Sequence, residues 1–238
     1  MRALLDLLFP ATCVGCGSAE EVLCAECTGL LCAPARPRLP TPAPPLLPMP
    51  YAVADYAGAV RAVVLGYKEH EQVAVTGVLG HAMATAVFAA AAGSARVTPS
   101  TRVALVPVPS APAARRRRGF DPVQRLARAA RATLQSRGIG AEVVPLLSHV
   151  RAVRDSAGLS SSQRAENLLG AFAARADASR RVAGQTVIVV DDVVTTGATL
   201  AEAARALRCV GVITTTSAVL AATVRSSGLA QKGLHKER

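Results

Sequence analysis

From Tyr51 onward, the chain alternates between helix-like and strand-like hydrophobic patterns. Apolar residues that recur every three or four positions are typical of a helix with one buried face. This spacing predicts helices over Val60–Tyr67, Gly77–Ala92, Pro122–Arg137 and Ala198–Val210. A short β-branched run predicts a strand over Val103–Val108, and a continuous apolar run predicts a buried strand over Val187–Val190. A final β-rich run predicts a strand over Val212–Val219. Strands without polar alternation need cover on both faces, so the order of elements predicts an α/β fold with a mostly parallel sheet.

A proline-rich segment separates this region from the amino terminus. Eight of the seventeen residues from Pro34 to Pro50 are proline. Because proline fixes φ and disfavours helix in the residue before it, we expect an extended linker there. The predicted organisation is therefore a small module over residues 1–33, a linker over 34–50, an α/β domain over 51–224 and a basic, disordered tail over 225–238.

No apolar run in the sequence approaches the ~18 residues that are needed to cross a bilayer. The first residues, MRALLDLLFPATC, resemble a signal peptide only superficially. Asp6 interrupts their apolar stretch, and Thr12 and Cys13 stand where small cleavage-site residues are expected. We expect this segment to form a short amphipathic helix packed on the body. The sequence therefore predicts a cytoplasmic protein without a membrane span.

Composition adds a globular core and a basic surface to this picture. Hydrophobic residues make up 51% of the 238 residues, which excludes wholesale disorder. The 27 Lys and Arg against 16 Asp and Glu give a formal charge of +11, which favours polyanionic ligands. Arg125, Arg128 and Arg131 repeat at i, i+3 along a predicted helix. They form either a track for the phosphates of single-stranded DNA or a solvated helix face.

Four cysteines near the amino terminus have the spacing of a metal site. Two CxxC pairs are separated by seven residues and comprise Cys13, Cys16, Cys24 and Cys27. Each pair can place two thiolates on one ion, and together they predict a tetrahedral structural zinc site in a zinc-ribbon-like module. Disulfide pairing would require an oxidising compartment, and a redox CxxC would require a thioredoxin-like strand and helix. We expect Cys32 to be a bystander and Cys209 to be a packed thiol.

A second pattern predicts a site for a phosphorylated sugar. Asp191 and Asp192 follow the apolar strand Val187–Val190, and a loop rich in hydroxyl groups then leads into a helix. Backbone N–H groups at such a helix start bind phosphate. The loop comprises Thr195, Thr196, Gly197, Ala198 and Thr199. Carboxylates beside a phosphate suit sugar hydroxyls or a divalent metal, so the whole pattern favours a phosphorylated ribose over a simple helix cap. The GxxxxGK[ST] motif of P-loop proteins is absent from the sequence.

The segment VIVVDDVVTTGAT resembles the phosphoribosyl-pyrophosphate (PRPP) signature of type I phosphoribosyltransferases. From Cys13 to about Leu220 the chain is similar to the ComF family, which joins a four-cysteine zinc module to a phosphoribosyltransferase-like domain. Further matching segments are 56–68, Val106–Pro109 followed by Arg118–Phe120, and Arg164–Asn167 followed by Gly170–Phe172. The chain departs from the family at Asp121-Pro122, where Asn-Gln is usual, and at Ser156, where glutamine is common.

The resemblance implies a role for each matching residue. The loop 195–199 would hold the 5-phosphate of PRPP, and the catalytic residues Asp191 and Asp192 would hold the ribose hydroxyls. Magnesium would bridge these hydroxyls and the pyrophosphate, whose charge Arg118 and Lys68 would neutralise. Two functions are implied. One is an enzyme that transfers phosphoribosyl from PRPP to a nitrogen nucleophile. The other is a non-catalytic module that senses PRPP or a nucleotide and binds DNA alongside the DNA-uptake machinery in competence.

Overall fold

The computed structural model describes residues 12–19, 21–69, 73–94, 102–151 and 161–223. The amphipathic helix expected before Cys13, the tail 225–238 and the position of Ser156 lie outside these residues.

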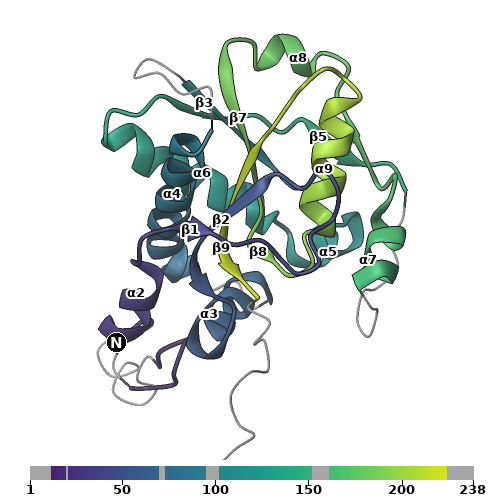
Figure 1. The fold of residues 1–238 in the computed structure, drawn as a ribbon. Coiled ribbons are helices and arrows are strands. Elements are labelled where there is room, and N and C mark those ends of the chain that lie inside the picture. The colour runs from purple at the N-terminus through teal and green to yellow at the C-terminus, as the bar shows by residue number, and fades with distance from the viewer. Residues whose placement is uncertain (1–11, 20, 70–72, 95–101, 152–160, 224–238) are drawn as a thin grey trace, which may run out of the picture.

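A mostly parallel sheet forms the centre of the molecule (Figure 1). Its strands run in the order β1-β2-β9-β7-β3-β4, and β8 extends the pairing along β9. Among the described strands of this sheet, β1 is antiparallel to its neighbour and the others pair in parallel. The strands are β1 (Arg36–Pro37), β2 (Met49–Asp55), β3 (Arg102–Pro107), β4 (Ala141–Val143), β7 (Gln185–Val190), β8 (Val193–Val194) and β9 (Thr216–Ala222). The predicted α/β fold with a mostly parallel sheet is confirmed.

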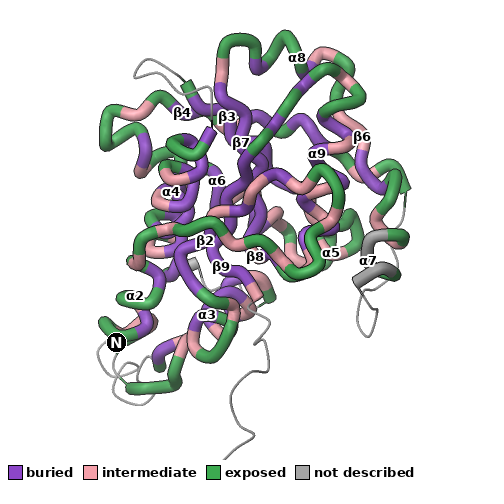
Figure 2. Tube along the Cα trace, in the orientation of Figure 1, coloured by how far each residue is buried: buried purple, intermediate pink, exposed green. Residues whose placement is uncertain are grey.

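Helices cover both faces of the sheet, which explains its unbroken apolar strands (Figure 2). On β7, Ile188 and Val190 face the core that includes α3, α4 and α6, while Val187 and Val189 face the core that includes α9. Both faces of β7 are therefore removed from water, so alternation with polar residues would have buried polar groups. The helices are α2 (Ala25–Leu31), α3 (Gly58–Glu69), α4 (Thr76–Ala92), α5 (Pro112–Arg118), α6 (Pro122–Ser136), α7 (Ser161–Leu168), α8 (Ala178–Arg181) and α9 (Ala198–Arg208), with a 3-10 turn η1 (Val73–Val75).

Small residues let α4 and α6 pack closely. A Cβ atom built on Gly80 of α4 would lie 2.5 Å from the Cβ of Ala129 in α6, so this contact requires glycine. Aromatic residues make up only 3% of the chain, so small residues contribute much of this packing. None of the helices in the described part of the chain is both long and apolar enough to span a bilayer.

The predicted strand Val212–Val219 was wrong over its first four residues. Gly211 has φ 78°, and β9 begins only at Thr216. The Thr214 hydroxyl lies 3.0 Å from the carbonyl oxygen of Val187 and 2.9 Å from that of Thr216. The contact with the Thr216 carbonyl is local and gives the backbone an alternative to strand pairing, as threonine side chains often do in connections. The contact with Val187 holds this connection against β7.

The proline-rich segment 34–50 lies against the sheet. Arg36 and Pro37 pair with Ala52 and Tyr51, and β2 already begins at Met49. Proline lacks an N–H donor, which suits Pro37 to β1, the edge strand of the sheet.

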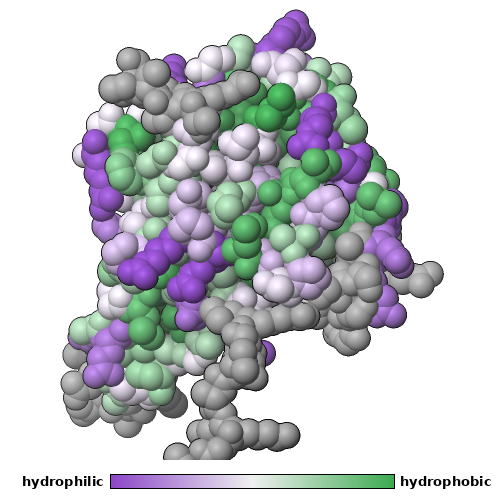
Figure 3. Space-filling view, in the orientation of Figure 1, coloured by the Kyte–Doolittle hydropathy of each residue, from purple (hydrophilic) through white to green (hydrophobic). Residues whose placement is uncertain are grey.

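Apolar surface crosses the middle of the face of the molecule seen in Figure 3.

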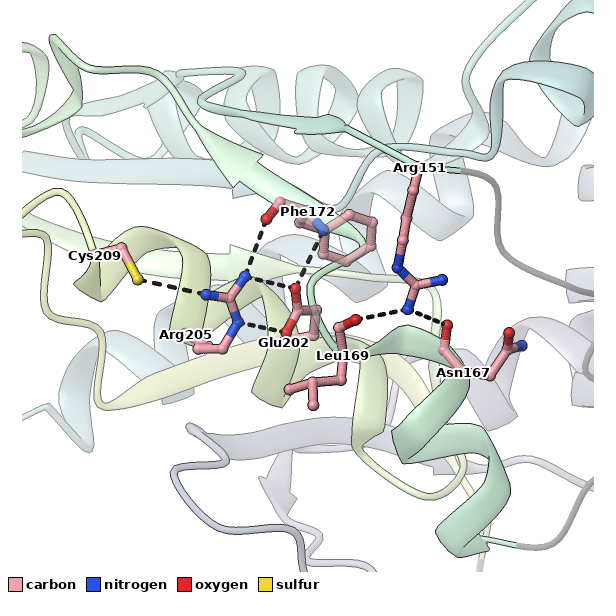
Figure 4. Close-up of polar contacts among 7 residues, drawn as sticks. All are labelled: Arg151, Asn167, Leu169, Phe172, Glu202, Arg205 and Cys209. Carbon is pink, nitrogen blue, oxygen red and sulfur yellow. Dashed lines mark hydrogen bonds and ion pairs between the residues drawn. The ribbon is translucent and has the colours of Figure 1, made fainter.

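A second, antiparallel sheet of β5 (Leu147–His149) and β6 (Phe172–Ala174) is tied to α9 by a buried carboxylate (Figure 4). Glu202 accepts a hydrogen bond from the Phe172 N–H at 3.2 Å and forms an ion pair with Arg205 at 2.7 Å. Arg205 also donates to the Phe172 carbonyl at 3.1 Å. Burial alone would raise the pKa of Glu202, but the N–H donors of Arg205 and Phe172 outweigh it and lower that pKa. Glu202 and Arg205 together satisfy both backbone groups of Phe172.

Arg151 ties the other end of this region. Its Nη2 donates to the carbonyl oxygen of Asn167, in the last turn of α7, at 2.8 Å and to that of Leu169, just after the helix, at 2.6 Å (Figure 4). A cation at this position satisfies carbonyl groups that the helix itself leaves unpaired.

We expect Arg205→Ala to lower the free energy of unfolding by about 2 kcal/mol at pH 7, because it removes charge-assisted hydrogen bonds from a buried carboxylate. A group whose folded-state pKa is lowered contributes stability above its unfolded pKa, and loses it as the pH falls through the folded-state pKa. The difference between wild type and variant should therefore shrink below about pH 4. Urea unfolding at several pH values measures both effects.

Arg175→Ala is the matched control. Arg175 forms an ion pair with Asp177 at 3.0 Å, but Arg175 is exposed and Asp177 is partly exposed. Exposed pairs contribute little to stability, so this variant should unfold close to wild type. Equal losses in Arg205→Ala and Arg175→Ala would contradict the role of Glu202 as a buried anchor.

Candidate functional site

A cavity of about 240 Å³ lies at the carboxyl ends of β3 and β7. The chain continues from β3 to β4 on one side and from β7 to β9 on the other, so the connections diverge between these strands. Parallel α/β sheets bind their ligands at such a divergence. The cavity is lined by Lys68, Val108, Pro109, Ser110, Ala111, Ala114, Arg118, Pro122, Val123, Asp191, Asp192 and Thr199.

Two adjacent carboxylates form one wall of this cavity. Asp191 and Asp192 follow β7 directly and are both buried. The Asp192 N–H donates to Asp191 Oδ1 at 2.9 Å. Burial, followed by the negative charge of Asp192, raises the pKa of Asp191 to about 8. At neutral pH Asp191 is therefore mostly protonated, and can both donate and accept a hydrogen bond.

Lys68 provides the charge that balances Asp192. Its Nζ lies 2.5 Å from Asp192 Oδ2, and the ammonium comes from the last turn of α3 rather than from the segment that carries the acids. Burial alone would lower the pKa of Lys68, but the charges of Asp192 and Asp191 outweigh it and raise that pKa. The ammonium of Lys68 therefore stays charged, and an incoming cation or hydroxyl group meets a carboxylate that already has a partner.

The residues beside Lys68 dock the end of α3. Tyr67 is buried, and its hydroxyl donates to the Pro122 carbonyl at 3.2 Å. Burial raises the pKa of Tyr67 to about 12, so the hydroxyl remains a donor. Tyr67 also meets the Phe120 ring edge to face at 6.4 Å. The sequence motifs did not single out Tyr67. Its position at the end of a predicted helix, between apolar residues and Lys68, was the one feature of the sequence that pointed to it.

Glu69 then orients Arg118 toward the cavity. Its carboxylate binds Arg118 Nη2 at 3.0 Å and Arg117 Nη2 at 3.1 Å. The Arg118 side chain is 13% exposed, and its Nε is buried without a hydrogen-bond acceptor among the described residues. Arg118 therefore retains a donor on a side chain that is already fixed in place.

The loop before α9 adjoins the acids. Gly197 has φ 77°, and a Cβ atom there would lie 2.8 Å from Leu47 Cδ2, so both conformation and space require glycine. The Thr196 hydroxyl accepts from the Ala198 N–H at 3.4 Å. The N–H groups of Thr196, Gly197 and Thr199 have no acceptor among the described residues. These donors at a helix start suit an oxyanion.

Asp121, where the sequence differs from the ComF pattern that it resembles, has a clear structural role. Its Oδ1 accepts from the Gln124 N–H at 3.1 Å and caps α6, while Pro122 occupies the first helical position, where no N–H is needed. Its Oδ2 accepts from the Ser110 N–H at 2.9 Å. Asp121 therefore joins the start of α6 to the loop after β3 that lines the cavity.

The arginines of the predicted track divide into two groups. Arg125 is half-buried, and its guanidinium carbon lies 4.0 Å from the centroid of the Phe120 ring. Arg125 and Arg128 line a second cavity of about 520 Å³. Arg131 is exposed one turn further along α6 and is not part of that lining.

The four CxxC cysteines converge. The Sγ atoms of Cys13, Cys16, Cys24 and Cys27 all lie within 4.8 Å of one another and are positioned to hold a metal ion. A tetrahedral zinc with Zn–S bonds of ~2.3 Å separates its sulfurs by about 3.8 Å. The Cys16–Cys24 distance is 3.7 Å.

The surroundings of these thiols shift their pKa values in opposite directions. The Cys24 N–H donates to Cys13 Sγ at 3.4 Å and lowers the pKa of Cys13 to about 6, whereas burial raises that of Cys27. A Cβ atom on Gly15 would lie 2.7 Å from Cys27 Sγ. The cluster thus depends on glycine in the first CxxC turn.

The remaining two cysteines lie apart from the cluster. Cys32 is exposed. The expectation that Cys209 is a packed thiol was wrong, because it is exposed and receives a contact from Arg205 at 3.4 Å. Cys209 follows Leu207 by two positions, which turns it about 200° away from the buried face of α9.

Comparison with known families adds a single match. The model of the phosphoribosyl transferase domain matches residues 81–234, which include β3, the acid pair and the loop before α9. Lys68 and the cysteine cluster precede the matched range. No curated protein matches the chain.

Proposed function

The chain belongs to the phosphoribosyl transferase family, and from that premise we propose that its 240 Å³ cavity binds PRPP. One observation carries the proposal. Residues from four separate places in the chain, namely Lys68, Arg118, the acid pair and Thr199, line one cavity at the point where the sheet connections diverge. Cationic, anionic and helix-terminal groups meet there, as a ligand with two phosphate ends and a central diol requires.

Each part of PRPP has a matching group. The 5-phosphate fits the N–H donors of Thr196, Gly197 and Thr199, with the hydroxyls of Thr195, Thr196 and Thr199 nearby. The ribose diol fits Asp191 and Asp192, because carboxyl oxygens accept hydrogen bonds from hydroxyl groups. The pyrophosphate fits Arg118 and Lys68.

Magnesium fits this set of donors. It prefers oxygen ligands and in proteins commonly takes one or two carboxylates together with substrate phosphates. Asp191 and Asp192 would hold it, and it would supply charge neutralisation for the pyrophosphate.

We propose transfer of the phosphoribosyl group as the reaction. The bond between C1 and the pyrophosphate oxygen breaks, its electron pair leaves with pyrophosphate, and a nitrogen nucleophile forms the new bond to C1. Positive charge develops on the ribose as the bond breaks. Asp192, held by Lys68, stabilises that charge electrostatically. Arg118, held by Glu69, stabilises the leaving group.

We also propose that the chain is of the ComF type, with zinc bound by the four cysteines. The paired CxxC turns ahead of the phosphoribosyl transferase domain support this assignment. ComF resemblance brings a second candidate function, the handling of single-stranded DNA during uptake, without turnover of PRPP. The observation that favours it is the exposure of Arg128 and Arg131 on α6.

Metal analysis of freshly purified protein should find about one zinc per chain. Gly15→Ala should lose most of it, because the added Cβ would lie 2.7 Å from Cys27 Sγ, which is closer than van der Waals contact allows. Gly29→Ala is the control, since α2 has open space at that position. Zinc well below one equivalent in wild type, or equal zinc in the two variants, would overturn the assignment.

Titration with PRPP should show magnesium-dependent binding that weakens by about tenfold to a hundredfold in Asp192→Asn and in Thr196→Val, the scale of one charge-assisted hydrogen bond. Asp177→Asn and Thr133→Val make the same changes outside the cavity and should bind like wild type. Release of pyrophosphate across a panel of nucleobases then tests turnover. Unchanged PRPP binding in both Asp192→Asn and Thr196→Val would show that the ligand binds elsewhere.

Single-stranded DNA should bind with little sequence preference and with log affinity falling by about 0.7 per log salt for each phosphate contacted. Replacing Arg125, Arg128 and Arg131 together by Ala should flatten that slope by roughly two units. The control replaces Arg175, Arg180 and Arg181, which removes the same charge around α8. Equal slopes for the two triple variants would show that DNA affinity depends on net charge alone and would contradict a track on α6.

A further inference from the structure

The second cavity, of about 520 Å³, lies on the other face of α5 from the proposed PRPP cavity. Ala114 and Arg118, one turn apart on α5, line the PRPP cavity. Arg115 and Gly119, also one turn apart, line the second cavity. The two linings share no residue, so a ligand in the second cavity occupies a separate site. Its volume lies within the ~300–1,000 Å³ range of small-molecule sites.

The charge of this cavity is strongly positive. Its lining comprises Arg115, Arg116, Gly119, Phe120, Asp121, Gln124, Arg125 and Arg128. None of the four arginines forms an ion pair with another described residue. Both oxygens of Asp121, the single acid of the lining, already accept backbone hydrogen bonds. The arginines therefore lack a carboxylate partner within the described protein.

Among these arginines, Arg125 is held in place with a hydrogen-bond donor available. Its guanidinium stacks on Phe120 at 4.0 Å, which uses one face of the plane and leaves the N–H edge available. Its Nη1 is buried and has no hydrogen-bond acceptor among the described residues. A buried donor without an acceptor is costly, and a bound oxyanion would remove that cost.

We propose that this cavity binds an oligophosphate, a chain of directly linked phosphates, either free or carried by a nucleotide. Such an anion concentrates several charges in one small volume, as the four arginines do around one cavity. Single-stranded DNA spreads one charge per nucleotide along its length, and it would follow the exposed face of α6 through Arg131 as well. The proposal stands apart from the PRPP site and does not depend on it.

Titration with inorganic triphosphate at physiological salt tests the proposal, with adenosine triphosphate and a short single-stranded oligonucleotide as further probes. Arg125→Ala and Arg128→Ala should each weaken triphosphate about tenfold to a hundredfold. Arg131→Ala removes the same charge from the same helix outside the cavity and should bind triphosphate like wild type. Phe120→Leu keeps the charge but removes the stacking face, so it should weaken binding less than Arg125→Ala.

The two phosphate sites are separable in the same experiment. Thr196→Val should weaken PRPP and leave triphosphate unchanged, and Arg125→Ala should do the reverse. Unfolding midpoints close to wild type show that the variants are folded. Equal affinity for both triphosphates assigns recognition to the phosphate chain, and tighter binding of adenosine triphosphate adds contacts to the nucleoside. Absence of triphosphate binding, equal weakening by Arg131→Ala, or binding of the oligonucleotide alone would overturn the proposal.

Discussion

Two aspartates that are buried side by side at the end of a strand destabilise each other's charged form, and a nearby cation offsets that effect. Lys68 provides that cation, and much of the site follows from the need to bring it there. The last turn of α3 is held by Tyr67 on one side and by Glu69 on the other, so the ammonium of Lys68 enters between two fixed neighbours. Breaking such a buried pair is far more costly than its net contribution suggests, because the remaining carboxylate has no partner.

The end of α3 therefore positions both the acidic and the basic side chains of the cavity. The contact of Glu69 with Arg118 fixes the cationic side, and the contact of Lys68 with Asp192 fixes the anionic side. Both rest on α3, whose other face is buried against the same core as β7. Preorganised charges lose little entropy when a ligand binds, which is the main physical advantage of a site held by a rigid helix.

The sequence predicted the parts of the site that depend on local order. Asp191 and Asp192 had to lie at the carboxyl end of a buried strand, and Cys13 and its three partners had to converge, because spacing along the chain determines both. Contacts between segments that are distant in the chain could not be predicted from the sequence. Neither the stacking of Arg125 on Phe120 nor the approach of Leu47 to Gly197 leaves a periodic signal. The predicted start of β9 was wrong because a hydrogen bond of Thr214 outweighed the β-propensity of residues 212–215. The prediction for Cys209 was wrong because its position around α9 decided its exposure more than its hydrophobicity did.

Asp121 shows how a departure from a family pattern can follow from structure. Where the ComF pattern has asparagine, Asp121 caps α6 and accepts the Ser110 N–H from the loop that lines the 240 Å³ cavity. Pro122 is compatible with this cap because the first helical residue needs no N–H donor. One carboxylate thus holds both the wall of the first cavity and the turn that carries Phe120. Since α5 buries none of its residues, the position of its arginines depends on this anchor and on Glu69 rather than on a core of its own.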